Sequence, residues 1–178
     1  MAKKTVPKLA LLVLLGFIAF PAAALTISVA PSEGEEYAPP PDGSGSPLRS
    51  LVSGCMDLLF DSGWIVTDSA ATRGPRSAWI RGGDALSEAR EGLVDYMIAI
   101  YVDWVPSSFH KGILLPATVA YSIVRVSDGK TIIEGEVKGS PDSEETSTHF
   151  AEAASQVGTL VAQACVKPLR TLAEGGEL

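Results

Sequence analysis

Histidine, cysteine and basic residues are scarce in this sequence of 178 residues. It has two histidines, two cysteines, and 14 lysines and arginines against 21 acidic residues, which gives a formal net charge of −7. Zinc sites are usually built from clustered Cys and His side chains. His110 and His149 stand in no His-Glu-x-x-His pattern and beside no pair of cysteines. We therefore expect neither a metal site nor a cofactor, and the acidic excess argues against nucleic acid as a partner.

The N-terminus has the pattern of an export signal. Three lysines within the first eight residues precede an apolar run over residues 9–20, and Pro21 with three alanines follows. This pattern predicts a signal peptide over residues 1–24, cleavage after Ala24 and a periplasmic or secreted protein. The alternative is an uncleaved anchor, because residues 25–30 extend the apolar stretch towards the length that spans a bilayer.

Removal of residues 1–24 would take away three lysines and no acid, so the net charge would change from −7 to −10. A domain of this charge has little electrostatic attraction to anionic lipid. Contact with a membrane is therefore expected only if the N-terminal helix is retained. No cysteine directly follows the apolar run, so the usual lipid-anchor signal is missing.

Alternating strand patterns and helix caps predict a single α/β (α+β) domain. We expect a strand at 25–30, a Pro-, Gly- and Glu-rich flexible connection to residue 46, a helix at 47–63, a strand at 64–67, a short helix from 84, a strand at 94–104, a hairpin of strands 118–126 and 131–138, and a long helix from 143 to about 173. This order favours a two-layer sandwich over residues 47–174 together with the first strand. Its mixed sheet would have about four to five strands, with two main helices on one face.

Local signals support these boundaries. Ser46 and Pro47 form a typical helix start, with a capping hydroxyl and a proline at the first helical position. The Asp128-Gly129 pair between two β-rich runs is a strong hairpin signal. Pro168 should kink the long helix or begin a separate last turn.

Cys55 and Cys165 fall on the apolar stripes of the first and last predicted helices. In an oxidising compartment an even pair of cysteines favours a disulfide, which would close a loop of about 110 residues and contribute roughly 4–5 kcal/mol. The alternative is that both are small buried hydrophobic residues.

Two segments resemble a group of bacterial envelope domains. Residues 92–100 are similar to the Gly-apolar-Asp-Tyr strand entry of that group, and residues 118–135 are similar to its hairpin. The group includes the penicillin-binding-protein activator LpoB, the curli secretion protein CsgG and the N-terminal domain of TolB. The resemblance implies a non-enzymatic periplasmic module that docks onto envelope proteins.

Two irregular stretches hold the candidate interaction residues. The first, between residues 69 and 83, carries the local basic and aromatic cluster Arg73, Arg76, Trp79 and Arg81. Arg and Trp are enriched at interface hot spots. The alternative is that Trp79 covers a sheet edge while the arginines pair with surface acids.

The second stretch, residues 106–116, carries the apolar residues Phe109, Ile113 and Leu114. They would form a contact surface if exposed, or cap the core if folded back. The same stretch holds Ser107, Ser108 and His110, which leaves a small secreted hydrolase as an alternative function. A structural envelope protein held by an uncleaved N-terminal helix is a third, and no catalytic residue is expected under the leading hypothesis of an interaction or assembly module.

Overall fold

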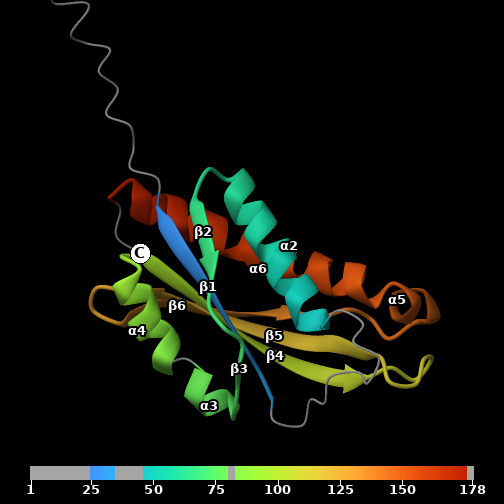
Figure 1. Ribbon diagram of the computed structural model, residues 1–178. Helices are drawn as coiled ribbons and strands as arrows, with labels where there is room; N and C mark the ends of the chain where they lie inside the picture. Colours follow the sequence, from blue (N-terminus) through green and yellow to red (C-terminus); the bar gives the residue numbers. More distant parts are fainter. Residues whose placement is uncertain (1–24, 35–45, 80–82, 176–178) are drawn as a thin grey trace, which may run out of the picture.

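The computed structural model describes residues 25–34, 46–79 and 83–175 (Figure 1). The elements, in chain order, are β1 (Thr26–Glu33), α2 (Pro47–Asp61), β2 (Ile65–Asp68), β3 (Thr72–Arg73), α3 (Arg76–Trp79), α4 (Gly83–Glu91), β4 (Tyr96–Pro106), β5 (Leu114–Arg125), β6 (Lys130–Lys138), α5 (Glu144–Thr148) and α6 (Phe150–Ala173). The predicted α/β class, with its mixed sheet, is confirmed.

The sheet has the strand order β2-β1-β4-β5-β6, and the two-residue strand β3 also pairs with β1. β1 is parallel to β2, β3 and β4, whereas β4, β5 and β6 form an antiparallel meander. The turn between β5 and β6 has Gly129 at φ +70°, a conformation that favours glycine. The hairpin predicted from Asp128 and Gly129 is thus present.

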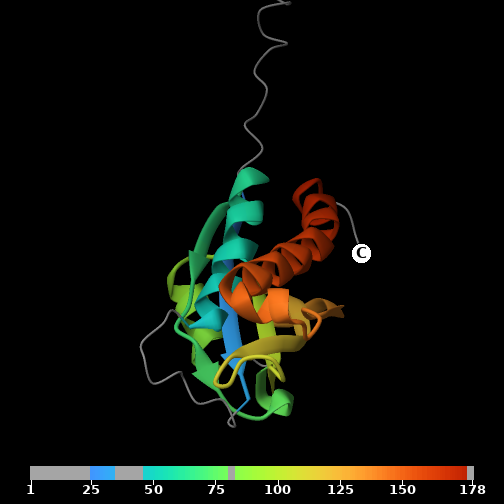
Figure 2. The ribbon, with the colours of Figure 1, turned by 90° about the vertical axis from the view of Figure 1, so that its right-hand side faces the viewer.

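The main core lies between one face of the sheet and the helices α2 and α6. Figures 1 and 2 show these two helices side by side on that face, where they contact each other extensively. Ile98, Ile100 and Val102, every second residue of β4, are fully buried in this core. The predicted arrangement of two main helices on one face is confirmed.

Glycines let α2 and α6 approach closely. A Cβ atom added at Gly158 would lie 1.9 Å from the carbonyl oxygen of Leu51, and one added at Gly54 would lie 2.1 Å from that of Ser155. The Thr159 hydroxyl donates to the Gly54 carbonyl oxygen across the contact at 3.3 Å. Backbone therefore meets backbone where the helices cross.

The opposite face of the sheet is covered in part by α3 and α4, which lie below it in Figure 1. A smaller apolar cluster forms there from Met97 and Ala99 of β4, Ala85 and Ala89 of α4, and Val124 of β5. Beyond α3, this face remains open over β5 and β6. Arg76 and Trp79 lie at the boundary between the covered and the open part.

Three of the differences from the expected boundaries affect the fold most. β1 runs to Glu33 and includes Pro31. Proline has no N–H to donate to a neighbouring strand, but Pro31 lies where β2 has ended and β3 has not begun, so the strand continues past it. β5 begins at Leu114, since residues 114–116 pair with the end of β4. The last helix is divided at His149, and α6 then continues past Pro168, so no separate last turn begins there.

Candidate interaction surface

The segment of residues 72–79, called the Arg–Trp segment below, is tied to the sheet by an ion pair between a half-exposed arginine and a buried glutamate. Strand β3 sets Arg73 beside Glu33 at the end of β1. Arg73 Nε donates to Glu33 Oε1 at 3.0 Å, and Trp104 Nε1 donates to Glu33 Oε2 at 3.2 Å. The Glu33 side chain is only 4% exposed. Burial raises its pKa above the usual value, and the contacts with Arg73 and Trp104 offset part of that rise.

Arg76 spans the open part of the sheet face. Its guanidinium contacts Asp103 Oδ2 of β4 at 3.5 Å and Glu136 Oε2 of β6 at 3.4 Å. All three side chains are about half exposed, so each ion pair contributes little to stability. The two contacts place the Arg76 side chain of α3 between β4 and β6.

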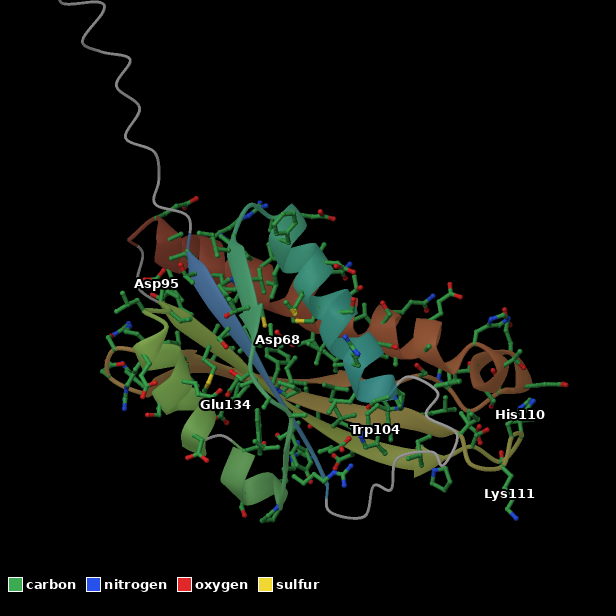
Figure 3. The ribbon with its side chains drawn as sticks, viewed as in Figure 1. Asp68, Asp95, Trp104, His110, Lys111 and Glu134 are labelled. Carbon is green, nitrogen blue, oxygen red and sulfur yellow. The ribbon has the colours of Figure 1, made fainter. Side chains whose placement is uncertain are left out.

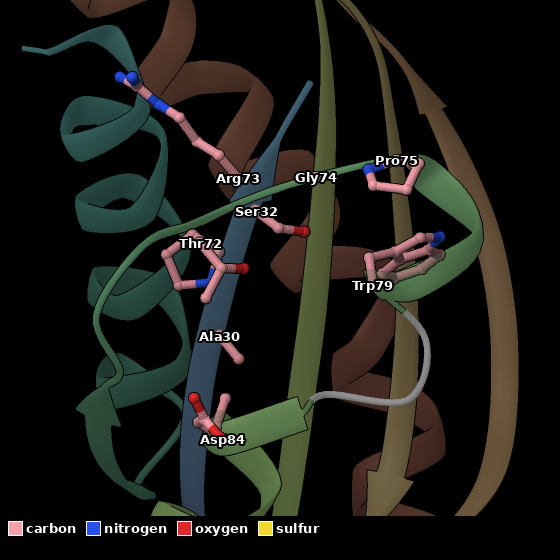
Figure 4. Close-up of a pocket in the computed structure, with 10 residues that line it drawn as sticks. Ala30, Ser32, Thr72, Arg73, Gly74, Pro75, Trp79 and Asp84 are labelled. Atoms are coloured by element: carbon pink, nitrogen blue, oxygen red, sulfur yellow. The ribbon is translucent and has the colours of Figure 1, made fainter. Parts of the chain in front are cut away.

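Trp79 lies against Tyr101, with ring centroids 6.3 Å apart and planes inclined at 40°. On one side it borders a hollow of about 260 Å³, shown in Figure 4, which is also lined by Ser32, Thr72 and Asp84. On its other side is a shallower hollow over β5 and β6. Trp79 thus separates two concave areas on the same face.

The structure brings Arg76 and Trp79 together on one face of the sheet, whereas the ion pair of Arg73 with Glu33 lies on the side of the main core, next to Trp104. Arg81 lies outside the described residues. The role of this cluster in binding stays a prediction. Arg73 and Arg76 do pair with acids, but Trp79 lies on Tyr101 of β4, a strand inside the sheet rather than at its edge. The contacts of Arg76 and Trp79 place both side chains next to open surface.

The second candidate surface lies in the loop between β4 and β5. Figure 3 labels His110 and Lys111 there, at one end of the molecule. Phe109 is 54% exposed, whereas Ile113 and Leu114 are half-buried. Leu114 belongs to β5. The apolar surface of this loop therefore depends mainly on Phe109.

Serine hydroxyls in this loop contact an aspartate. Ser107 Oγ donates to Asp142 Oδ1 at 3.0 Å, and the hydroxyl and the amide of Ser108 both donate to Asp142 Oδ2. These contacts hold the pKa of Asp142 below its usual value. His110 contributes its backbone amide, which donates to Ser107 Oγ at 3.3 Å. This network ties the β4–β5 loop to the chain that precedes α5.

Cys55 of α2 and Cys165 of α6 are free thiols in the structure, and both are fully buried in the main core. Burial raises the pKa of Cys55 to about 12 and raises that of Cys165 as well. Both thiols are therefore protonated at neutral pH. The predicted disulfide remains a prediction.

Comparison with known proteins gives matches among solved structures alone, since no family model and no curated protein matches the chain. A PelC dodecamer from Paraburkholderia phytofirmans is 18% identical over 79% of this chain and 86% of that chain, with a TM-score of 0.46. The lipoprotein GNA1162 from Neisseria meningitidis is 14% identical over 83% and 99%, with a TM-score of 0.45.

TolB from Acinetobacter baumannii is 12% identical over 75% of this chain and 28% of that chain, with a TM-score of 0.33. All three TM-scores are below 0.5. We therefore base the proposals below on the chain's own residues.

The acidic partners of the Arg–Trp segment were not recognised as site residues in the sequence. Glu33 falls in a stretch whose Pro, Gly and Glu content is typical of a flexible connection. The alternation along β4 does predict that Asp103 lies on the same strand face as Tyr101. Nothing in that pattern reveals that α3 covers this face, because the pairing depends on the path of the chain between β2 and β4.

The described residues also limit other kinds of site. Within the described ranges, no group of three or more His, Cys, Asp and Glu side chains is arranged to hold a metal ion. No helix in these same ranges is long and apolar enough to cross a membrane.

Proposed function

We propose that this chain is a non-enzymatic interaction or assembly module of the bacterial cell envelope that docks onto a partner protein outside the cytoplasm. The Arg–Trp segment is the primary contact surface. The observation that carries this proposal is the fixed placement of Arg76 and Trp79 beside open sheet surface, through contacts with Asp103, Glu136 and Tyr101.

Preorganisation supports a role in binding. Arg and Trp side chains contribute strongly to interfaces, and holding them in place before binding lowers the entropy lost on association. Arg76 is already held by two carboxylates, and Trp79 already lies on an aromatic ring. A partner would therefore meet a surface that is largely formed.

The chemistry of this surface indicates the kind of partner. Exposed Glu134 and Glu136 lie next to the half-exposed guanidinium of Arg76, so positive and negative groups alternate over a short distance. Such a mixture fits a protein surface with complementary charges rather than a polyanion. Trp79 and the two hollows beside it would supply the apolar part of the contact.

Site-specific photo-crosslinking in bacterial cells tests this proposal. A photoreactive residue at Ser77, which is exposed on α3, should yield a discrete adduct with an envelope protein. The same residue at Gln163, which is exposed on α6, should yield none. A photoreactive residue at Lys111 examines the β4–β5 loop. Adducts at Lys111 without adducts at Ser77 would move the contact surface to that loop and overturn the assignment.

Substitutions provide the matching loss-of-binding test. The double variant Arg76→Glu and Trp79→Ala should lose the adduct formed from Ser77, because it reverses the central charge and removes the aromatic anchor. Arg49→Glu, an equal charge reversal at an exposed position of α2, should keep it. An unchanged adduct in the double variant would show that these side chains do not form the contact.

A further inference from the structure

The end of the domain at which β1 begins carries exposed apolar side chains. Ile65 is 55% exposed and Leu93 is 86% exposed. Both lie next to Leu25. The Ile65 amide donates to the Leu25 carbonyl oxygen. The amide of Asp95, two residues after Leu93, donates to the carbonyl oxygen of Thr26, which follows Leu25. Leu25 is the first described residue and directly follows residues 1–24.

Leu93 has a backbone conformation that leucine rarely adopts. Its φ of +54° is in the left-handed region, and among the described residues it alone adopts a positive φ without being glycine. Glycine would relieve this strain. The exposed Leu93 side chain buries almost no apolar surface against the rest of the domain. Its side chain therefore has no evident role within the fold, which points to a contact outside it.

A hollow of about 430 Å³ adjoins Leu93 and Leu25 and is also lined by Tyr96. Arg90 and Arg125 stand at its rim. Arg90 Nε donates to the Val126 carbonyl oxygen, and Arg125 pairs with Asp128 at 3.3 Å. Asp95 also lines the hollow, and its carboxylate accepts from the Thr26 amide at 2.8 Å. Apolar groups and guanidinium groups thus lie together at this end.

The sequence before Leu25 identifies what this end would face. Residues 9–25 form a stretch of 17 residues without a charge, close to the shortest length that spans a bilayer. β1 begins at Thr26, so no spacer separates that stretch from the folded domain. If residues 9–25 stay in a membrane, the residues beside Leu25 must lie in its headgroup region.

We propose that residues 1–24 are retained as a membrane anchor and that the end of the domain around Leu25 rests on the bilayer surface. Leu93 and Ile65 reach into the boundary between headgroups and acyl chains. Arg90 and Arg125 face the lipid phosphates. The Arg–Trp segment, on a face of the sheet, stays accessible to a partner. This assignment favours the anchor over cleavage after Ala24, and it does not depend on the proposed docking function.

Fluorescence quenching by lipids tests the orientation. Full-length chains carrying Leu93→Cys, Ile65→Cys or Lys111→Cys would be labelled with an environment-sensitive dye and reconstituted into vesicles of phosphatidylethanolamine and phosphatidylglycerol containing headgroup-region nitroxide lipids. Cys55 and Cys165 are fully buried and should not react. The chain with its two native cysteines alone is the labelling control.

Figure 3 shows Asp95, two residues from Leu93, and Lys111 at opposite ends of the molecule. The eleven residues of β4 between these ends span about 35 Å. We expect a blue shift and loss of emission for dyes at positions 65 and 93, and neither change at position 111. Unquenched dyes at 65 and 93 in chains that float with the vesicles, or equal quenching at all three positions, would overturn the proposal. So would a cellular protein whose N-terminus, by mass, is Leu25.

Discussion

Two buried polar side chains, Glu33 and Ser122, meet opposite surroundings. Glu33 has two donors aimed at its carboxylate oxygens. Ser122 is fully buried on β5, and its hydroxyl has no hydrogen-bond partner. Burial of an ionised group costs desolvation energy even when the group has hydrogen-bond partners. Burial of a neutral hydroxyl without a partner costs the hydrogen bond that it would make with water. Both reduce stability. Each therefore gives a distinct prediction.

Glu33→Gln should flatten the dependence of stability on pH. Because the pKa of Glu33 is raised in the fold, the native state binds more protons than the unfolded state between the ordinary value of 4.5 and the raised value. The free energy of unfolding should then fall as the pH rises through this window, by at most about 1.4 kcal/mol per pH unit for one proton. Urea unfolding of both proteins from pH 4 to pH 8 measures the slope. Equal slopes would contradict the prediction.

Ser122→Ala should stabilise the protein by about 1 kcal/mol, because it removes a buried hydroxyl that makes no hydrogen bond. The matched comparison is Ser147→Ala. Ser147 is also buried, but its hydroxyl donates to the Ser143 carbonyl oxygen at 2.6 Å and contacts the Ser107 hydroxyl. This second change should destabilise by about 1 kcal/mol. Urea midpoints that move in the same direction for both variants would refute the distinction.

The contact between the helices α2 and α6 leaves no room for added volume. Gly158→Ala would gain about 1 kcal/mol of helix propensity. The new methyl group would overlap the Leu51 carbonyl oxygen, and backbone cannot yield as a flexible side chain can. We expect the clash to dominate and the variant to lose about 3 kcal/mol of stability. Gln163→Ala, at an exposed position of the same helix, should stay within about 0.5 kcal/mol of the wild type by denaturant unfolding.

Most elements can be predicted from the sequence because their signals are local. The stripe of α2, the alternation of β4 and the Asp128-Gly129 turn each specify an element within a few residues. β3 and α3 were not predicted. Each is too short to show a period, and their positions depend on contacts with Glu33, Asp103 and Glu136 from distant parts of the chain.

For the molecule as a whole, the reactivity of the two cysteines shows whether the main core contains free thiols or a disulfide. The structure places free thiols of Cys55 and Cys165 on the two helices that cross over the sheet. In this state neither should react with iodoacetamide in the native protein, and both should react in urea. Intact mass before and after alkylation measures this. A protein that gains no label in urea until a reductant is added would instead contain the disulfide predicted from the sequence.

The candidate surface was predictable as a cluster but not as an arrangement. Arg73, Arg76 and Trp79 stand out in an acidic sequence because of their composition alone. The placement of Arg76 and Trp79 on the second face of the sheet, and of Arg73 beside Glu33, follows from the course of the chain after β2, which crosses to β4 through β3, α3 and α4. Composition identifies such residues, whereas topology decides which of them share a surface.

The crossing of α2 and α6 also bears on when the core can form. α6 follows every strand of the sheet in the sequence, yet it covers the same face as α2, the first helix described. During synthesis that face has only half its cover until α6 has been made. The main core can therefore be completed only after the last helix is available.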